Sequence, residues 1–346
     1  MTNINININA LSYAYGQPAC SGRIRTVPED FIVNEIPGFE PDGEGEHVLL
    51  HIQKRNTNTD WLAKKISQFV GLRQVDVSYA GMKDRNAVTT QWFSVRLAGK
   101  PEPDWMALNS DEITVLQHHR HSRKLRKGAL KGNRFKIVVR DIDGDVSDLE
   151  TRLQTIKEQG IPNYFGEQRF GIDGANITEA KTMFSGKRVK SHHQRSLYLS
   201  AARSYIFNDH LSLRVGMASW NKAINGDVML LSGTNSYFVA EIADDEINRR
   251  IDTFDIHPSG VMWGRGRSPA MGESADMENA LKEKHADFCE GLEKAGLDQS
   301  RRSLRLMVND LGWKMDADNK VLELEFELPA GSYATSVLRE LVIANV

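Results

Sequence analysis

The sequence predicts an α+β fold made of two folding units, and three observations support this prediction. The chain has 346 residues, more than one ordinary domain contains. With 40% hydrophobic residues, it holds enough apolar material for two cores. Strand patterns dominate its first half, helical patterns its middle, and a strand followed by a helix its end. This order is typical of an α+β domain that is interrupted by an insertion.

The first half contains the clearest strand signals. Apolar or alternating runs predict strands at 47–53, 77–80, 91–97, 113–116 and 135–139. Asn58 or Thr59 is expected to cap a helix that runs to Val70, and Gly71 suits the left-handed residue that closes it. The expected apolar face of this helix consists of Trp61, Leu62, Ile66 and Phe69.

The rest of the chain reads as helices, one loop and a final strand and helix. Helices are predicted at 146–158 and 194–214, and a stripe of Met277, Leu281, Phe288 and Leu292 predicts one more. Clustered Gly and Pro predict an irregular loop at 258–272. A strand is expected at 321–328, then a turn, then a helix capped by Ser332. The expected core face of that helix consists of Val337, Leu338, Leu341 and Val342.

Composition and motif content limit the cellular compartment and the kinds of binding site that are expected. Cys20 and Cys289 lie far apart, which predicts neither a disulfide framework nor a zinc site. No apolar stretch reaches about eighteen residues, so no membrane span is expected, and the Asn-rich start predicts no signal peptide. GxxxxGK[ST], GxGxxG and HExxH patterns are absent. We therefore expect a cytoplasmic protein with no membrane, metal or cofactor partner.

One basic strip stands out against a slightly acidic chain. The net charge is −2, yet 113–140 contains nine Lys or Arg and no Asp or Glu. A cationic strip on an acidic body is a plausible footprint for a polyanion such as RNA. A solvated basic loop explains the same run equally well.

The segment Gly81–Trp92 lies between two predicted strands, where scaffolds often hold functional loops. Lys83 and Arg85 flank Asp84, and nearby cations favour an ionised carboxylate. An ionised Asp can act as a nucleophile or as a general base. From these residues alone, a solvated hairpin turn is the plainer interpretation.

The pattern Gly81-x-Lys83-Asp84-x-x-Ala87-x-Thr89-x-Gln91 resembles the signature motif of the TruD pseudouridine synthases. Five further segments resemble that family in the same order, and together they span Pro28 to Thr335. They are Pro28-Glu29-Asp30-Phe31-x-Val33-x-Glu35, Pro41-Asp42-Gly43-Glu44-Gly45-Glu46-His47, Lys131-Gly132-Asn133-x-Phe135, Pro162-Asn163-Tyr164-Phe165-Gly166-x-Gln168-Arg169-Phe170-Gly171 and Leu328-Pro329-Ala330-Gly331-Ser332-Tyr333-Ala334-Thr335.

This resemblance implies that the chain isomerises uridine to pseudouridine in tRNA, typically at position 13 of the D arm, without metal or cofactor. Asp84 would be the catalytic carboxylate, trapping the ribose covalently or removing a ribose proton. The substrate-binding residues implied are Arg25, Phe31, Lys83, Asn133, Phe135 and Tyr333. Lys83 and Arg85 would orient Asp84 or contact phosphate.

Individual roles follow from the same resemblance. Phe31 would support the flipped-out base or its surroundings. Asn133 would form hydrogen bonds with an edge of the uracil, and Tyr333 would stack on the base. Related sequences often have Lys at Arg25 and Phe at Tyr333. The alternative explanation is that the aromatics are core residues and that Asn133 is a turn or strand-start residue.

The resemblance also implies a discontinuous catalytic domain, 1–158 and 308–346, around a mixed, mostly antiparallel sheet. Residues 159–307 would form an inserted α/β domain specific to the family, and a monomer is expected. The competing hypotheses are a non-catalytic RNA-binding or chaperone protein of the same fold, and a metal-dependent nuclease or glycosidase.

Overall fold

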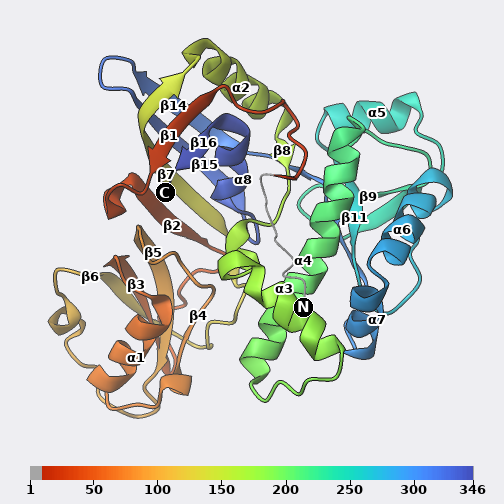
Figure 1. The fold of residues 1–346 in the computed structure, drawn as a ribbon. Helices are drawn as coiled ribbons and strands as arrows, with labels where there is room; N and C mark the ends of the chain where they lie inside the picture. The colour runs from red at the N-terminus through yellow and green to blue at the C-terminus, as the bar shows by residue number, and fades with distance from the viewer. Residues whose placement is uncertain (1–9, 346) are drawn as a thin grey trace. The chain divides into compact units, whose positions relative to one another are not determined.

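The computed structural model describes residues 10–345, so the prediction about a signal peptide lies outside the described residues. The chain divides into two compact units (Figure 1). Among the described residues, the sheet unit consists of 19–149, 308–334 and 342–345, and the helical unit consists of 10–18, 150–307 and 335–341. Two helices contribute residues to both units: α2 (Val146–Gln159) and α8 (Ala334–Leu341).

A ten-stranded sheet forms the centre of the sheet unit. Its main path runs β14-β15-β7-β2-β5-β3-β6, while β1 joins β7 and β16, and β4 joins β5. Among the described strands, β2–β5 and β1–β16 pair in parallel and the others antiparallel, which confirms the predicted mixed sheet. The bounds are β1 (Cys20–Ile24), β2 (Phe31–Pro37), β3 (His47–Arg55), β4 (Val77–Tyr79), β5 (Val88–Arg96), β6 (Ile113–His121), β7 (Leu130–Gly144), β14 (Asn309–Asp316), β15 (Val321–Pro329) and β16 (Ile343–Asn345).

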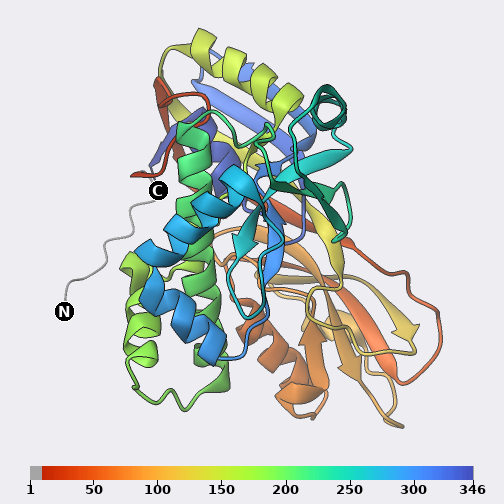
Figure 2. The same cartoon turned by 90° about the vertical axis from the view of Figure 1, so that its right-hand side faces the viewer.

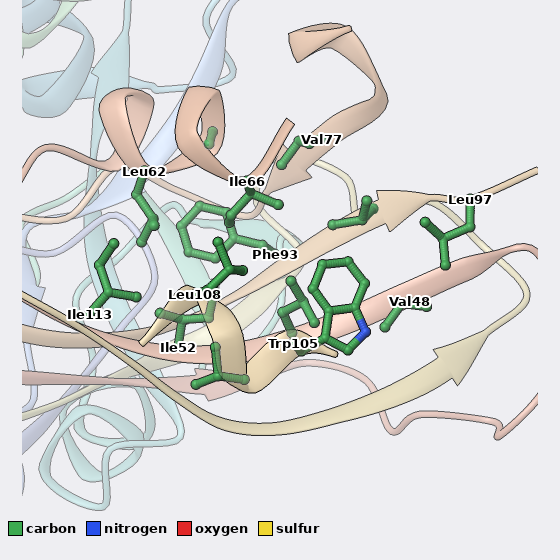
Figure 3. Packing of buried hydrophobic residues seen from close by; sticks show 14 residues of the cluster. Val48, Ile52, Leu62, Ile66, Val77, Phe93, Leu97, Trp105, Leu108 and Ile113 are labelled. Atoms are coloured by element: carbon green, nitrogen blue, oxygen red, sulfur yellow. The ribbon is translucent and has the colours of Figure 1, made fainter. Parts of the chain in front are cut away.

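The largest hydrophobic cluster described in this unit lies between helix α1 (Thr59–Phe69) and one face of the neighbouring strands β3, β4, β5 and β6. Side chains alternate along a strand, so Val48, Leu50 and Ile52 of β3 point to the same face. Phe93 of β5 and Trp105 complete the packing there, and Figure 3 shows both rings among the aliphatic side chains. The core fixes α1 on the sheet, and Thr59 in its first turn contacts the segment 80–87, which joins β4 to β5.

The apolar face predicted for α1 is half correct. Leu62 and Ile66 are buried, one turn apart, as predicted. Trp61 and Phe69 were predicted to lie on the same apolar face, but these residues remain 42% and 37% exposed, and Phe69 only borders the core, with its ring centre 6.2 Å from that of Trp105. Trp61 precedes Leu62 and so points about 100° away around the helix, where the Lys65 ammonium lies over its ring. Gly71 has φ +61°, as predicted for the closing residue.

Several strands exceed their predicted lengths, because pairing continues through polar residues. β6 runs five residues beyond the predicted end, along the edge of the sheet, and β7 is fifteen residues long. The last helix begins at Ala334, two residues after the predicted cap Ser332. Local polarity therefore underestimates strands whose partners supply the hydrogen bonds.

The helical unit packs α3, α6 and α7 against the long helix α4, and Figure 2 shows α6 and α7 alongside it. A four-stranded antiparallel sheet, β10-β9-β11-β12, and a two-stranded ladder, β13-β8, accompany the helices. The bounds are β8 (Ile161–Pro162), α3 (Ala175–Phe184), α4 (His192–Gly216), β9 (Asp227–Leu231), β10 (Tyr237–Ala240), α5 (Asp245–Asp252), β11 (Ile256–Met262), α6 (Gly272–Lys284), α7 (Ala286–Lys294), β12 (Ser300–Ser303) and β13 (Arg305–Leu306). None of the described helices combines the length and apolar composition needed to cross a bilayer.

Two predictions in the helical unit were wrong. Pro258 and the residues up to Met262 belong to strand β11 rather than to a loop, because Pro258 pairs with β9 and Ser259 to Met262 pair with β12. The stripe from Met277 to Leu292 covers two helices instead of one. His285 interrupts it in a non-helical conformation, with its Nε2 held 2.7 Å from an Asp209 carboxylate oxygen.

The core between β5 and α1 predicts a large cost for losing one ring. Phe93 is fully buried, so Phe93→Ala should lower the free energy of unfolding by about 3–5 kcal/mol. Val75 is 61% exposed, so Val75→Ala should change it by less than about 0.5 kcal/mol. Urea unfolding followed by circular dichroism measures both. Equal, small effects would contradict a tightly packed core here.

Candidate active site

The loop 80–87 presents Asp84 between β4 and β5 of the sheet unit. The Asp84 side chain is 36% exposed, whereas the residues that follow from Ala87 onward are buried in the sheet. A carboxylate on a short loop between two paired strands is held at a defined position and can still be reached from solvent. The interpretation as a freely solvated turn does not fit the contacts that hold this loop.

The first contact is a buried ion pair between Lys83 and Glu35. Lys83 Nζ lies 2.9 Å from Glu35 Oε2, with side-chain exposures of 5% and 0%. The other Glu35 oxygen, Oε1, accepts a hydrogen bond from the Trp92 backbone at 3.4 Å. Breaking a buried pair leaves an uncompensated charge, which costs about 3–5 kcal/mol. The residue next to Asp84 is therefore fastened to strand β2.

A chain of neutral hydrogen bonds fastens the same loop to α1 and β5. Thr59 Oγ1, in the first turn of α1, accepts from the Lys83 backbone N–H at 3.0 Å and donates to Gln91 Oε1 at 3.0 Å. Gln91 Nε2 in turn donates to the Gly81 carbonyl at 3.1 Å. These bonds explain why Gln and Thr suit their positions, since each satisfies a buried polar group.

Lys54 of β3 also holds the loop 80–87, and no sequence motif predicted this role. Its buried Nζ donates to the main-chain carbonyls of Asp84, at 2.8 Å, and of Thr57, at 2.6 Å. Burial lowers the pKa of Lys54 from 10.5 to about 8; the negative charge of Asp84 opposes this shift and Lys83 adds to it. The available signal was its place in β3, where it continues the inward row of Leu50 and Ile52.

Arg25, the residue that follows β1, also contacts Asp84. Its Nη2 is 3.4 Å from Asp84 Oδ2, and its guanidinium carbon lies 4.2 Å from the centre of the Phe31 ring. Arg25 has φ +58°, an uncommon conformation for a residue with a side chain. Among the described residues, its buried Nε and Nη2 have no hydrogen-bond acceptor. Nη2 therefore lies beside the Asp84 carboxylate without an aligned hydrogen bond to it.

The turn after Arg25 is held by Asp30, which the Arg140 guanidinium contacts at 2.7–3.1 Å. Asp30 is 1% exposed and its Oδ2 also accepts from the Val27 backbone. The segment Pro28–Glu35 thus has a physical basis. Asp30 fixes the turn, Phe31 supports Arg25, and Glu35 binds Lys83.

The pairing of β2 with β7 sets the positions of Asn133 and Phe135 relative to Phe31 and Glu35. Cross-strand register sets Glu35 opposite Asn133, and Phe31 opposite Ile137. Phe31 and Phe135 are 1% and 5% exposed and pack edge to face, with ring centres 6.3 Å apart. As the alternative interpretation held, both rings belong to the core. Asn133 Oδ1 is buried and has no hydrogen-bond donor among the described residues.

Tyr333 lies half-buried in the connection between β15 and α8. Its stacking role stays a prediction. Arg85 is exposed on the loop, where it differs from the buried Lys83. In the part of the chain that the structure describes, no group of three or more His, Cys, Asp or Glu is arranged to hold a metal ion.

Comparison with known proteins identifies the family of this chain. The sequence model described as tRNA pseudouridine synthase D (TruD) matches residues 7–187 and 176–341. The chain belongs to the TruD family. It is 52% identical to tRNA pseudouridine synthase D of Methylococcus capsulatus over 333 residues, covering 96% of this chain and 94% of the relative. The Nitrosococcus oceani protein of the same name is 50% identical, covering 96% and 93%.

The fold of this chain also matches a solved structure. A crystal structure of a candidate tRNA pseudouridine synthase D (TruD) from Methanosarcina mazei superposes with a TM-score of 0.72. The match covers 99% of this chain and 97% of the other, at 24% sequence identity. It therefore supports the fold rather than any residue's role.

The buried Lys54 predicts a pH-dependent stability difference. Its pKa is about 8 in the folded chain, against an ordinary value of 10.5. Between these values the unfolded chain binds more protons, so the group makes folding more favourable as pH rises. Relative to Lys54→Met, the wild type should gain roughly 1 kcal/mol of unfolding free energy per pH unit from pH 8 to 10. Urea unfolding at several pH values measures this. A difference that stays constant across that range would contradict the assignment.

Proposed function

We propose that this TruD protein isomerises uridine to pseudouridine in tRNA, with Asp84 as the catalytic carboxylate. The observation that carries the proposal is the half-exposed Asp84 carboxylate, with Arg25 Nη2 at 3.4 Å and its loop fastened by Lys83, Thr59 and Lys54. The relatives named tRNA pseudouridine synthase D support tRNA as the substrate. Uridine 13 of the D arm is the target that the family resemblance implies.

The chemistry of the reaction suits a single, well-placed carboxylate. Uracil leaves the ribose at N1 and rejoins it through C5, so the product has the same atoms as the substrate. Cleavage of the C–N bond develops positive charge at the anomeric carbon, as in glycosidases. Asp84 can neutralise that charge by forming a covalent bond to the ribose or by removing a ribose proton. Both routes require the oxygen to be held in place before the bond breaks.

Arg25 is proposed to hold both Asp84 and the substrate. Its guanidinium rests on the Phe31 ring, and its buried Nε and Nη2 are available as donors. In this arrangement Phe31 acts through Arg25, because the ring itself is 1% exposed. Such fixed donors stabilise negative charge, which develops on the uracil as it leaves the ribose.

Asn133 and Tyr333 are proposed to hold the flipped base. The buried Asn133 Oδ1 is an unused acceptor that matches the N3–H of uracil. Stacking on an aromatic ring such as Tyr333 is worth roughly 1–3 kcal/mol per base, which offsets part of the cost of extruding the nucleotide. Phe135 supports strand β7 near Asn133 from the core, since its ring packs on Phe31 and Phe326.

Lys83 is proposed as a positioning residue rather than a phosphate ligand, because its ammonium is buried against Glu35. The catalytic domain is proposed to comprise 1–158 and 308–346, with 159–307 as the inserted domain. We further propose that the protein is a cytoplasmic monomer that needs neither metal nor cofactor.

The proposal predicts activity on tRNA alone. Purified protein with unmodified tRNA transcripts, in EDTA and without cofactor, should form pseudouridine at the D-arm uridine. Carbodiimide treatment followed by primer extension maps the product. Asp84→Asn keeps the size of the side chain but removes the charge, so it should lower the single-turnover rate by at least ~10²-fold.

A matched variant separates catalysis from a general loss of charge. Asp111→Asn changes an exposed carboxylate in the turn before β6 and should leave the rate unchanged. No product from folded wild-type protein across a full tRNA pool would contradict the synthase proposal. Equal rates in wild type and Asp84→Asn would keep the function and reject Asp84.

A further inference from the structure

Ion pairing divides the basic strip of the sheet unit into two parts. Four of its nine cations lie on strands and face carboxylates from other segments. The pairs are Arg120–Glu102 at 2.9 Å, Arg134–Glu327 at 2.6 Å, Lys136–Glu323 at 3.9 Å and Arg140–Asp30 at 2.7 Å. A cation that is already neutralised releases few counterions when it approaches a polyanion.

The other five cations lie in the β6–β7 connection (residues 122–129) or directly after it. They are Arg123, Lys124, Arg126, Lys127 and Lys131, and all are exposed. Within residues 10–345, none of the five has a carboxylate partner; Lys124 instead donates to the Val75 carbonyl at 2.9 Å. The free positive charge of the strip is therefore concentrated at one place.

The β6–β7 connection is firmly held, although most of its side chains are exposed. Leu125 is buried, its N–H donates to Ser94 Oγ at 3.0 Å, and its carbonyl accepts from Ser78 Oγ at 2.9 Å. Asp42 accepts from the Ser122 N–H at 3.0 and 3.1 Å. This last contact gives the Gly- and Glu-rich segment 41–47 a structural role.

Gly128 ties the connection to the candidate active site. Its N–H donates to the Ala80 carbonyl at 2.7 Å, and Ala80 is the first residue of the loop that presents Asp84. A ligand bound at the connection would thus be attached to the same rigid part of the sheet unit as Asp84.

A recess of about 470 Å³ opens beside the connection. It is lined by two rings, Phe39 and His121, whose centres are 6.0 Å apart, and by Arg123, Leu125 and Arg126. Trp92 packs edge-on against Phe39 at 6.0 Å and holds that ring in place. Aromatic rings beside unpaired guanidinium groups suit a nucleotide, since the base can stack while its phosphate meets the cations.

We propose that this recess binds one nucleotide of the substrate RNA, with the base against Phe39 and His121 and the phosphate on Arg123 and Arg126. The choice of RNA rests on the proposed function. Asp42, whose carboxylate is 3.2 Å from His121 Nδ1, repels a phosphate on its side and so directs it towards the two arginines. The recess is a second RNA contact, separate from the nucleotide that reacts at Asp84.

The test compares two double variants that change the net charge equally. Arg123→Gln with Arg126→Gln should weaken binding of an unmodified tRNA transcript roughly tenfold and reduce the slope of log Kd against log salt by about 1.5–2. Arg134→Gln with Lys136→Gln removes cations that are already paired, and should change Kd by less than about threefold. Filter binding with full-length protein at several salt concentrations measures both.

Phe39→Leu tests the stacking surface, because it keeps apolar volume but removes the ring. It should weaken binding by roughly fivefold or more while leaving the salt slope unchanged. Single-turnover rates at saturating RNA should equal the wild-type rate in all these variants. Circular dichroism confirms that each variant is folded.

The outcomes separate this proposal from the proposed function. Equal loss of affinity and slope in the two double variants would overturn the recess, even if wild type forms pseudouridine. Dependence of RNA binding on Arg123 and Arg126 without any product would support the recess and reject the synthase activity. A change in oligomeric mass with unchanged RNA binding would assign the recess to a protein partner and overturn the proposal.

Discussion

The buried ion pair between Lys83 and Glu35 is the constraint on which the arrangement around Asp84 depends. Glu35 is fully buried on β2, and Lys83 is the immediate neighbour of Asp84. Two charges removed from water are stable only together, so the loop has little freedom to leave the sheet. The hydrogen bonds from Thr59 and Lys54 then act on a loop whose position is already set.

Around that ion pair, the cationic side chains of the sheet unit differ in their partners. Lys83 is paired, Lys54 is buried against two carbonyl groups, and Arg25 retains unused donors beside Asp84. Fixed charges and donors of this kind need no rearrangement when charge develops in a reaction, which is how a preorganised site accelerates chemistry. The exposed cations of the β6–β7 connection act at longer range, where salt screens them, and contribute to binding instead.

The sequence located the Asp84 loop because its residues lie together in the chain and form a recognisable pattern. Other parts of the site depend on contacts that no local pattern reveals. Lys54 interrupts an otherwise apolar inward row of β3, and only its fold partners show why a lysine is stable there. The division of the basic strip likewise depends on distant carboxylates, such as Glu327, which lies 193 residues from Arg134. For the same reason, strand β11 was missed: its Pro and Gly indicate a loop until β9 and β12 pair with it.

The most direct test of this account is the rate of pseudouridine formation in Glu35→Gln. Without its partner, Lys83 no longer holds the loop on β2, so the Asp84 carboxylate should shift from its position. The single-turnover rate should then fall roughly 10²-fold, while RNA affinity stays within about twofold. Adding Lys83→Met removes the unpaired charge, and should restore stability without restoring the rate. A folded Glu35→Gln protein with the wild-type rate would contradict the claim that this ion pair positions Asp84.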